Sequence, residues 1–213
     1  MAPPSPSPTK TGNLAVGLAG QPVDYSFREL KKVSDLVFES PVSGTARRPA
    51  VNGDGNAEGY LDSIVAEGAR QGTKLNATSV RLCNNQLISL AGLDRTMYHV
   101  LDDPQELVWL DASCNQIQTI DEIVTSFPNL QVLYLHGNQL WHLSEVLKLQ
   151  KLPHLKKLTL HGNQIAEQRN YKLWVVAHLP HLRSLDFSTI TNLDRDKVDN
   201  WFRGYQKVQA AKA

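Results

Sequence analysis

The sequence predicts an α/β solenoid, a short right-handed horseshoe with a parallel sheet on its concave side and short helices on its outside. Two near-copies carry this prediction: LYLHGNQL begins at residue 133 and LTLHGNQI begins at residue 158. A self-similar spacing of about 25 residues is typical of solenoids in which each repeat supplies one strand and one return segment.

Four full copies of the template L-x-x-L-x-L-x-x-N-x-L lie between residues 77 and 165. Each L-x-L core predicts a short strand whose leucines point inward and whose other side chains point outward. A fifth copy begins at Leu182, Leu185 and Phe187, but Ile190 stands where its asparagine would be. After each strand the asparagine is expected to turn inward and bond to backbone groups of the bend and of the next repeat. These structural asparagines are Asn85, Asn115, Asn138 and Asn163.

The return segments are predicted to be short helices. One covers residues 144–149 with Ser144 as its N-cap, another covers residues 121–124, and a longer one fills residues 94–101 of the first gap. The returns end in x-Pro-x-Leu, where proline stops the helix and prepares the next strand.

The N-terminal region is predicted to hold several different segments. Residues 1–21 read as a disordered tail rich in Pro and Ser, in which Ser5 and Ser7 precede prolines and could be phosphorylated. Residues 22–76 form an extension and cap. Within it we expect an amphipathic helix at 30–37 that packs on the first repeat or reaches a partner, a flexible loop at 41–59, and a short helix at 60–69.

The repeats occupy residues 77–169, and residues 170–206 are predicted to form a C-terminal cap. The cap reads as a helix at 170–179, a strand at 182–187 and a final amphipathic helix that folds back over the open end of the core. Residues 207–213 are expected to be a fraying tail. The apolar positions of the final helix are Val198, Trp201, Phe202, Tyr205 and Val208.

Composition argues against several classes of protein. The 213 residues carry a formal net charge of +1, which disfavours a general nucleic-acid binder. No apolar run approaches the roughly 20 residues of a transmembrane helix, and the N-terminus lacks the pattern of a secretory signal. Cys83 and Cys114 lie inside repeats rather than in disulfide-rich caps. We therefore expect a cytoplasmic protein with no membrane contact and no direct contact with nucleic acid.

The sequence contains no P-loop, GxSxG, CxxC or HExxH motif. His136 and His161 are predicted on adjacent strands about 4.8 Å apart, where they could share a metal. A tetrahedral zinc site needs three or four ligands, however, and Ser113 and Ser188 flank the pair. Repeat copying explains the shared His-Gly-Asn turn, so we expect no enzyme, no cofactor and no metal site.

The outward-pointing positions predict a protein-binding concave face. Trp109 and Tyr134 are expected to be exposed aromatic anchors near its centre, unless a loop or the N-terminal segment covers them. Arg81 beside Asp111 reads as a cross-strand ion pair. Trp141 is expected on the convex side, packed against neighbouring turns or serving as a second contact. The predicted binding residues are Arg81, Trp109, Asp111, Val132, Tyr134, Lys157 and Thr159.

The repeat pattern resembles the short cytoplasmic class of the leucine-rich-repeat superfamily. Residues 170–202 are similar to the cap shared by the spliceosomal A-prime protein, the leucine-rich dynein light chain and tubulin-folding cofactors. Most of residues 21–202 resembles more closely a family of small leucine-rich-repeat proteins from the leucine-rich transmembrane and O-methyltransferase locus. DYSFR at 24–28, the two LxLHGN turns and DFS at 186–188 carry this resemblance, and no methyltransferase domain is expected here.

The resemblance implies a non-enzymatic protein of ciliated cells. The first hypothesis is a binding scaffold in a ciliary or flagellar axoneme, part of the cytoskeleton, whose partners are other proteins of a large assembly, including microtubule-associated subunits. The second is a regulatory adaptor subunit of a phosphatase-type enzyme that uses the same face. The third is a ribonucleoprotein-associated protein, which the similarity of the cap to the spliceosomal protein suggests.

Overall fold

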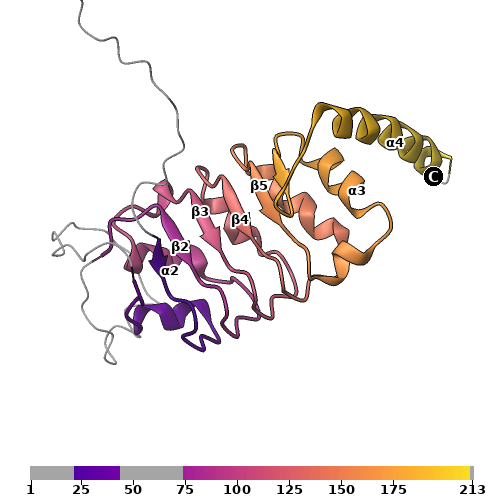
Figure 1. The fold of residues 1–213 in the computed structure, drawn as a ribbon. Coiled ribbons are helices and arrows are strands. Elements are labelled where there is room, and N and C mark those ends of the chain that lie inside the picture. Colours follow the sequence, from indigo (N-terminus) through magenta and orange to yellow (C-terminus); the bar gives the residue numbers. More distant parts are fainter. Residues whose placement is uncertain (1–21, 44–73, 212–213) are drawn as a thin grey trace, which may run out of the picture.

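In the computed structural model, which describes residues 22–43 and 74–211, short strands stand side by side in the order of the chain (Figure 1). Neighbouring strands are parallel from the first to the sixth, and the last pair is antiparallel. This arrangement confirms the predicted α/β solenoid with a parallel sheet. The strands are β1 (Val23–Asp24), β2 (Ser79–Arg81), β3 (Trp109–Asp111), β4 (Val132–Tyr134), β5 (Lys157–Thr159), β6 (Ser184–Leu185) and β7 (Ser188–Thr189).

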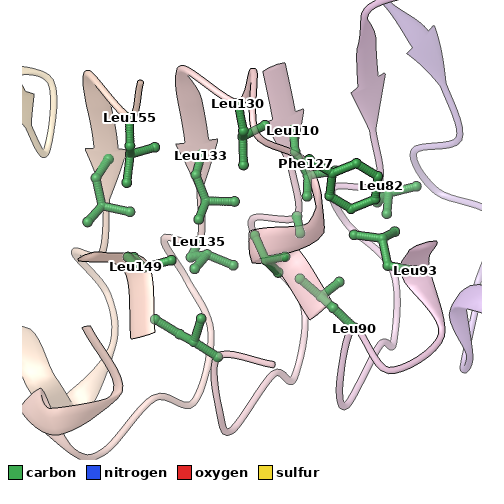
Figure 2. Close-up of a cluster of buried hydrophobic side chains, with 14 of the residues drawn as sticks. Leu82, Leu90, Leu93, Leu110, Phe127, Leu130, Leu133, Leu135, Leu149 and Leu155 are labelled. Carbon is green, nitrogen blue, oxygen red and sulfur yellow. The ribbon is translucent and has the colours of Figure 1, made fainter. Parts of the chain in front are cut away.

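The strand register matches the predicted columns. Trp109 pairs with Val132, and Asp111 pairs with Tyr134 across β3 and β4. The middle residue of each repeat strand is buried, as the alternation of faces requires. Leucines of successive repeats therefore stack into one continuous core, with Phe127 from a return segment among them (Figure 2).

The asparagines of the bends join each repeat to the one before it. Asn138 accepts a hydrogen bond through Oδ1 from the Ile117 N–H at 3.0 Å and donates through Nδ2 to the carbonyls of Ala112 and Leu135. Asn85, Asn115 and Asn163 make the same kind of contacts. The expectation of bonds to the next repeat is therefore wrong in direction, because the bend lies beside the preceding repeat.

Most return segments are 3₁₀-helices rather than α-helices. A 3₁₀-helix rises about 2.0 Å per residue, against about 1.5 Å for an α-helix, so fewer residues span the convex side. The α-helix expected at 94–101 is present as α2 (Leu93–Val100), but Ser144 is not an N-cap, because its helix already begins at Leu143. The 3₁₀-helices are η1 (Val33–Val37), η2 (Pro104–Glu106), η3 (Glu122–Ser126), η4 (Leu143–Lys151) and η5 (Gln164–Glu167).

At the N-terminal end, residues 22–43 lie against the first repeat. The strand β1 pairs in parallel with β2, and the buried side chains of Tyr25, Val33 and Leu36 belong to the common core. The predicted tail at 1–21 with its phosphorylation sites, the helix at 60–69 and most of the loop at 41–59 lie outside the described residues.

At the C-terminal end, α3 (Tyr171–His178) leads to the β6–β7 hairpin and then to α4 (Asn192–Ala210). Thr191 and Asp194 cap α4 reciprocally. The first half of α4 folds back over the end of the core as expected: Val198 is buried in the core, and Phe202 meets His178 of α3 with ring centres 5.2 Å apart. The second half of α4 instead projects from the end of the solenoid (Figure 1), and residues 207–210, expected to fray, are helical. Among the described residues, no helix is long and apolar enough to cross a membrane.

Candidate functional site

The concave side of the sheet holds an open groove of about 540 Å³, which we call the concave groove. Its floor comes from the outward-pointing side chains of β1 to β4. Its two rims come from the turn after β1 and from the loop of the β6–β7 hairpin. Its lining includes Asp24, Phe27, Arg81, Cys83, Trp109, Asp111, Tyr134, His136 and Phe187.

Charge in the concave groove is organised around Arg81. Its guanidinium lies 3.2 Å from the Asp24 carboxylate and 3.8 Å from Asp111, and it stands 5.3 Å from the centre of the Trp109 ring. The predicted Arg81–Asp111 pair is present, although Asp24 is the nearer partner. Burial opposes ionisation of Asp24, but hydrogen bonds from Ser26 and the charge of Arg81 outweigh it, so the pKa of Asp24 is lowered. Two carboxylates around one cation leave this end of the groove acidic.

Aromatic rings cross the groove from one strand to the next. Trp109 and Tyr134 meet edge to face with ring centres 5.8 Å apart, and Tyr134 meets Phe187 in the same way at 5.4 Å. The expectation that Trp109 is exposed is wrong: it is only 7% exposed because Arg81 and Tyr134 cover it from neighbouring strands.

The other predicted binding residues divide into buried and accessible ones. Asp111, Val132 and Thr159 are also buried, so they shape the floor rather than offer contact area. Arg81 and Tyr134 are half-buried and Lys157 is exposed, so these three remain available to a partner.

Two phenylalanines that sequence reasoning missed stand at the rims. Phe27 is 74% exposed and Phe187 is 62% exposed. Both have positive φ angles, 57° and 62°, which bulky residues rarely adopt. Phe187 was expected to face the core, but it occupies the two-residue loop of the hairpin with Asp186, and β6 ends before it. The pattern DFS gives no sign of this turn, because glycine or asparagine usually supplies the positive φ.

His136 and His161 stack with ring centres 4.7 Å apart and planes only 8° from parallel. The Nδ1 atom of His136 lies 2.9 Å from Thr159 Oγ1, and that of His161 lies 3.3 Å from Asp186 Oδ1. Burial, then the neighbouring charge of His161, lowers the pKa of His136, so this ring is mainly neutral. Across residues 22–43 and 74–211, no three His, Cys, Asp or Glu side chains are grouped to hold a metal. The pair extends the aromatic surface toward Phe187.

Two further side chains bear on what the site can do. Burial raises the pKa of the Cys83 thiol, which keeps it protonated and a poor nucleophile. On the convex side, Trp141 is 58% exposed, so its interpretation as a packed residue is wrong.

The side chains of the concave groove offer a partner aromatic rings and hydrogen-bonding groups.

Known proteins with the same repeats complete this description. A family model described as "Leucine-rich repeat" matches residues 76–213. Leucine-rich repeat-containing protein 51 of Macaca mulatta is 38% identical over 191 residues, which cover 90% of both chains. Its Mus musculus counterpart is 39% identical over 182 residues, covering 85% of each. In the solved Drosophila melanogaster SNF/U2A' complex, a chain is 28% identical with a TM-score of 0.53, over 64% of this chain and 74% of that one.

A repeat solenoid with a preformed concave surface is a protein-interaction scaffold. The chain belongs to the leucine-rich-repeat family and, within it, to the family of leucine-rich repeat-containing protein 51.

Proposed function

We propose that this scaffold is a non-catalytic structural component of a ciliary or flagellar axonemal complex and that it binds a protein partner in the concave groove. Support for the address comes from the motif resemblance described above. Support for the binding face comes from one observation: exposed Phe27 and Phe187 rings stand at opposite rims of a groove floored by aromatic and charged side chains.

The backbone of the two rims favours a binding role. A non-glycine residue held at positive φ costs about 1–3 kcal/mol, and such strain gathers at functional sites. Neither ring repays this cost by burial in the core, since both are largely exposed. A partner that covers the rings would recover the apolar burial, while the stiff sheet spares the complex the entropy of ordering a loop.

The concave groove is tested by rebinding the purified full chain to isolated axonemes from which salt washing has removed the endogenous protein. Phe27→Gly and Phe187→Gly keep the positive φ without strain, so both variants are expected to fold. Each is expected to weaken rebinding by about 30-fold, the effect of losing an interface hot spot.

Leu193→Ala is the matched control for that experiment, because Leu193 is an exposed apolar residue outside the groove. If the two glycine variants rebind as well as the control variant, the partner does not occupy the concave groove.

The address is tested separately by fractionating ciliated cells. Axonemal fractions are expected to contain the endogenous protein until high salt releases it. Absence from axonemes together with presence in nuclear extract would reject the axonemal address while leaving the groove as the binding face.

That result would favour the third hypothesis of the sequence analysis, a ribonucleoprotein-associated scaffold. The observation behind it is the likeness to the chain solved with SNF in the Drosophila complex. In that case this chain would bind an RNA-binding protein rather than RNA, since its net charge is only +1.

A further inference from the structure

A second apolar surface lies at the C-terminal end, where α4 leaves the body of the protein (Figure 1). There the start of η4, α3 and the second half of α4 border an open hollow of about 700 Å³, which we call the α3–α4 hollow. Its lining includes Leu143, Trp174, Trp201, Gly204, Tyr205 and Val208.

Large side chains in this hollow remain open to solvent. Trp201 and Tyr205 stack with ring centres 5.3 Å apart, and Val208, one turn further along, is 53% exposed. Tryptophan and tyrosine are the residues most enriched among interface hot spots.

Gly204 is unexplained by the fold alone. It lies inside α4, where glycine destabilises a helix relative to alanine. A Cβ atom at this position would meet nothing within 4 Å, so no neighbour in the chain requires its absence. Gly204 and Val208 are four residues apart and share a helix face that borders the hollow. A glycine there allows another backbone to approach α4 closely.

The one charged side chain among the residues that line the α3–α4 hollow, that of Arg169, is basic. Within the described part of α4 beyond Asn200, the charged residues are Arg203 and Lys207, and both are basic. The helix dipole favours cations at this end, and the same cations give the exposed apolar face a positive border.

We propose that the α3–α4 hollow docks an acidic amphipathic helix of a partner protein. Its apolar side packs on Trp201, Tyr205 and Val208, its backbone passes close to Gly204, and its carboxylates meet Arg169 and the basic end of α4. This is helix-in-groove recognition. It uses a different face from the concave groove and does not depend on the axonemal address.

The test uses the full chain and a fluorescein-labelled synthetic helix of about 18 residues, with leucines along one face and glutamates elsewhere. A twin peptide carries lysine at every glutamate position. Fluorescence anisotropy is expected to show binding of the glutamate peptide and at least a tenfold weaker binding of the lysine twin. Val208→Asp is expected to reduce binding of the glutamate peptide by about tenfold and, being exposed, to leave the melting temperature unchanged.

Gly204→Ala separates recognition from stability. Gly204→Ala is expected to raise the melting temperature, because alanine is the better helix former. The same substitution is expected to weaken binding of the glutamate peptide. Ile88→Ala, which changes an exposed apolar residue of the first repeat outside both surfaces, is the control and is expected to bind the glutamate peptide normally.

Several results would overturn the proposal: equal binding of both peptides, no binding of the glutamate peptide, or unchanged binding by Val208→Asp. Light scattering that shows a dimer of the free chain, dissociated by Val208→Asp, would instead assign the hollow to a second copy. Sedimentation with phosphatidylcholine–phosphatidylserine vesicles, without binding of the glutamate peptide, would assign it to a membrane surface.

Discussion

At the scale of single residues, the asparagines of the bends hold neighbouring repeats at a fixed spacing. Asn138 is buried, and its amide satisfies backbone groups in two repeats at once. A side chain of the same size without an amide would fill the space but would leave these groups without partners. A buried unsatisfied donor or acceptor costs about 1–3 kcal/mol.

Asn138→Ala is therefore expected to lower the free energy of unfolding by about 3 kcal/mol, measured by urea denaturation. Asn129→Ala is the matched control, because Asn129 is only half-buried and its side chain donates one hydrogen bond, to the Gln105 carbonyl. The control is expected to stay within about 0.5 kcal/mol of the parent chain. Equal effects of the two substitutions would show that the bend does not need its amide.

At the scale of elements, the side chain of Asp186 takes the place of a strand carbonyl at the end of the parallel sheet. In the earlier repeats the N–H after the strand donates to a main-chain carbonyl of the next strand, as Leu135 does to Thr159. The Oδ1 atom of Asp186 accepts hydrogen bonds from the backbone N–H groups of Leu160 at 2.7 Å and His161 at 2.9 Å. Its Oδ2 accepts from the hydroxyl of Tyr171 at 2.9 Å. One carboxylate thus ties β5, the hairpin and α3 together.

This arrangement predicts a pH dependence. Burial, together with the negative charge of Asp186, raises the pKa of Tyr171 well above its ordinary value. The folded protein therefore keeps the Tyr171 proton at pH values where the unfolded chain, with a pKa near about 10, releases it. The stability that this proton supports is complete below about pH 10 and falls as the pH rises above it.

Tyr171→Phe is expected to cost about 1–2 kcal/mol at pH 7 by removing the donor to Asp186. The same substitution should flatten the loss of stability between about pH 10 and 11. Urea denaturation of both chains at pH 7, 10 and 11 measures the two effects. Parallel stability curves would mean that Tyr171 does not titrate on unfolding.

At the scale of the whole molecule, the strand pairing and most of the packing between described elements join adjacent repeats, so stability is close to a sum over adjacent repeats. The N-terminal segment closes one end through buried Leu36, and α3 with the first half of α4 covers the other. Damage at one end is therefore expected to spread only weakly to the other.

Leu36→Ala leaves a cavity that costs about 2–5 kcal/mol. Hydrogen exchange is expected to speed up first at the amides around β2 and to leave β5 nearly as protected as before. The reciprocal variant, Val198→Ala on the buried face of α4, is expected to speed up hydrogen exchange at the C-terminal end alone. Uniform loss of protection from Leu36→Ala would show that the repeats unfold as a single unit.

Much of this protein follows from its sequence. The alternation of L-x-L cores predicts the inward and outward faces, the strand register and the Arg81–Asp111 neighbours, because these depend on a periodicity that every copy repeats. The buried asparagines follow for the same reason. These features are local in the repeat, and stacking only multiplies them.

The tertiary structure decided what the repeats do not share. Side chains on neighbouring strands bury Trp109. Phe27 and Phe187 are exposed at the rims because they lie in turns with positive φ, a conformation that the conformational preferences of phenylalanine do not predict. The direction of the asparagine bonds and the projection of α4 depend on which surfaces meet in three dimensions. The exposure of a side chain depends on which residues pack against it, and residues far apart in the chain pack together only in the folded solenoid.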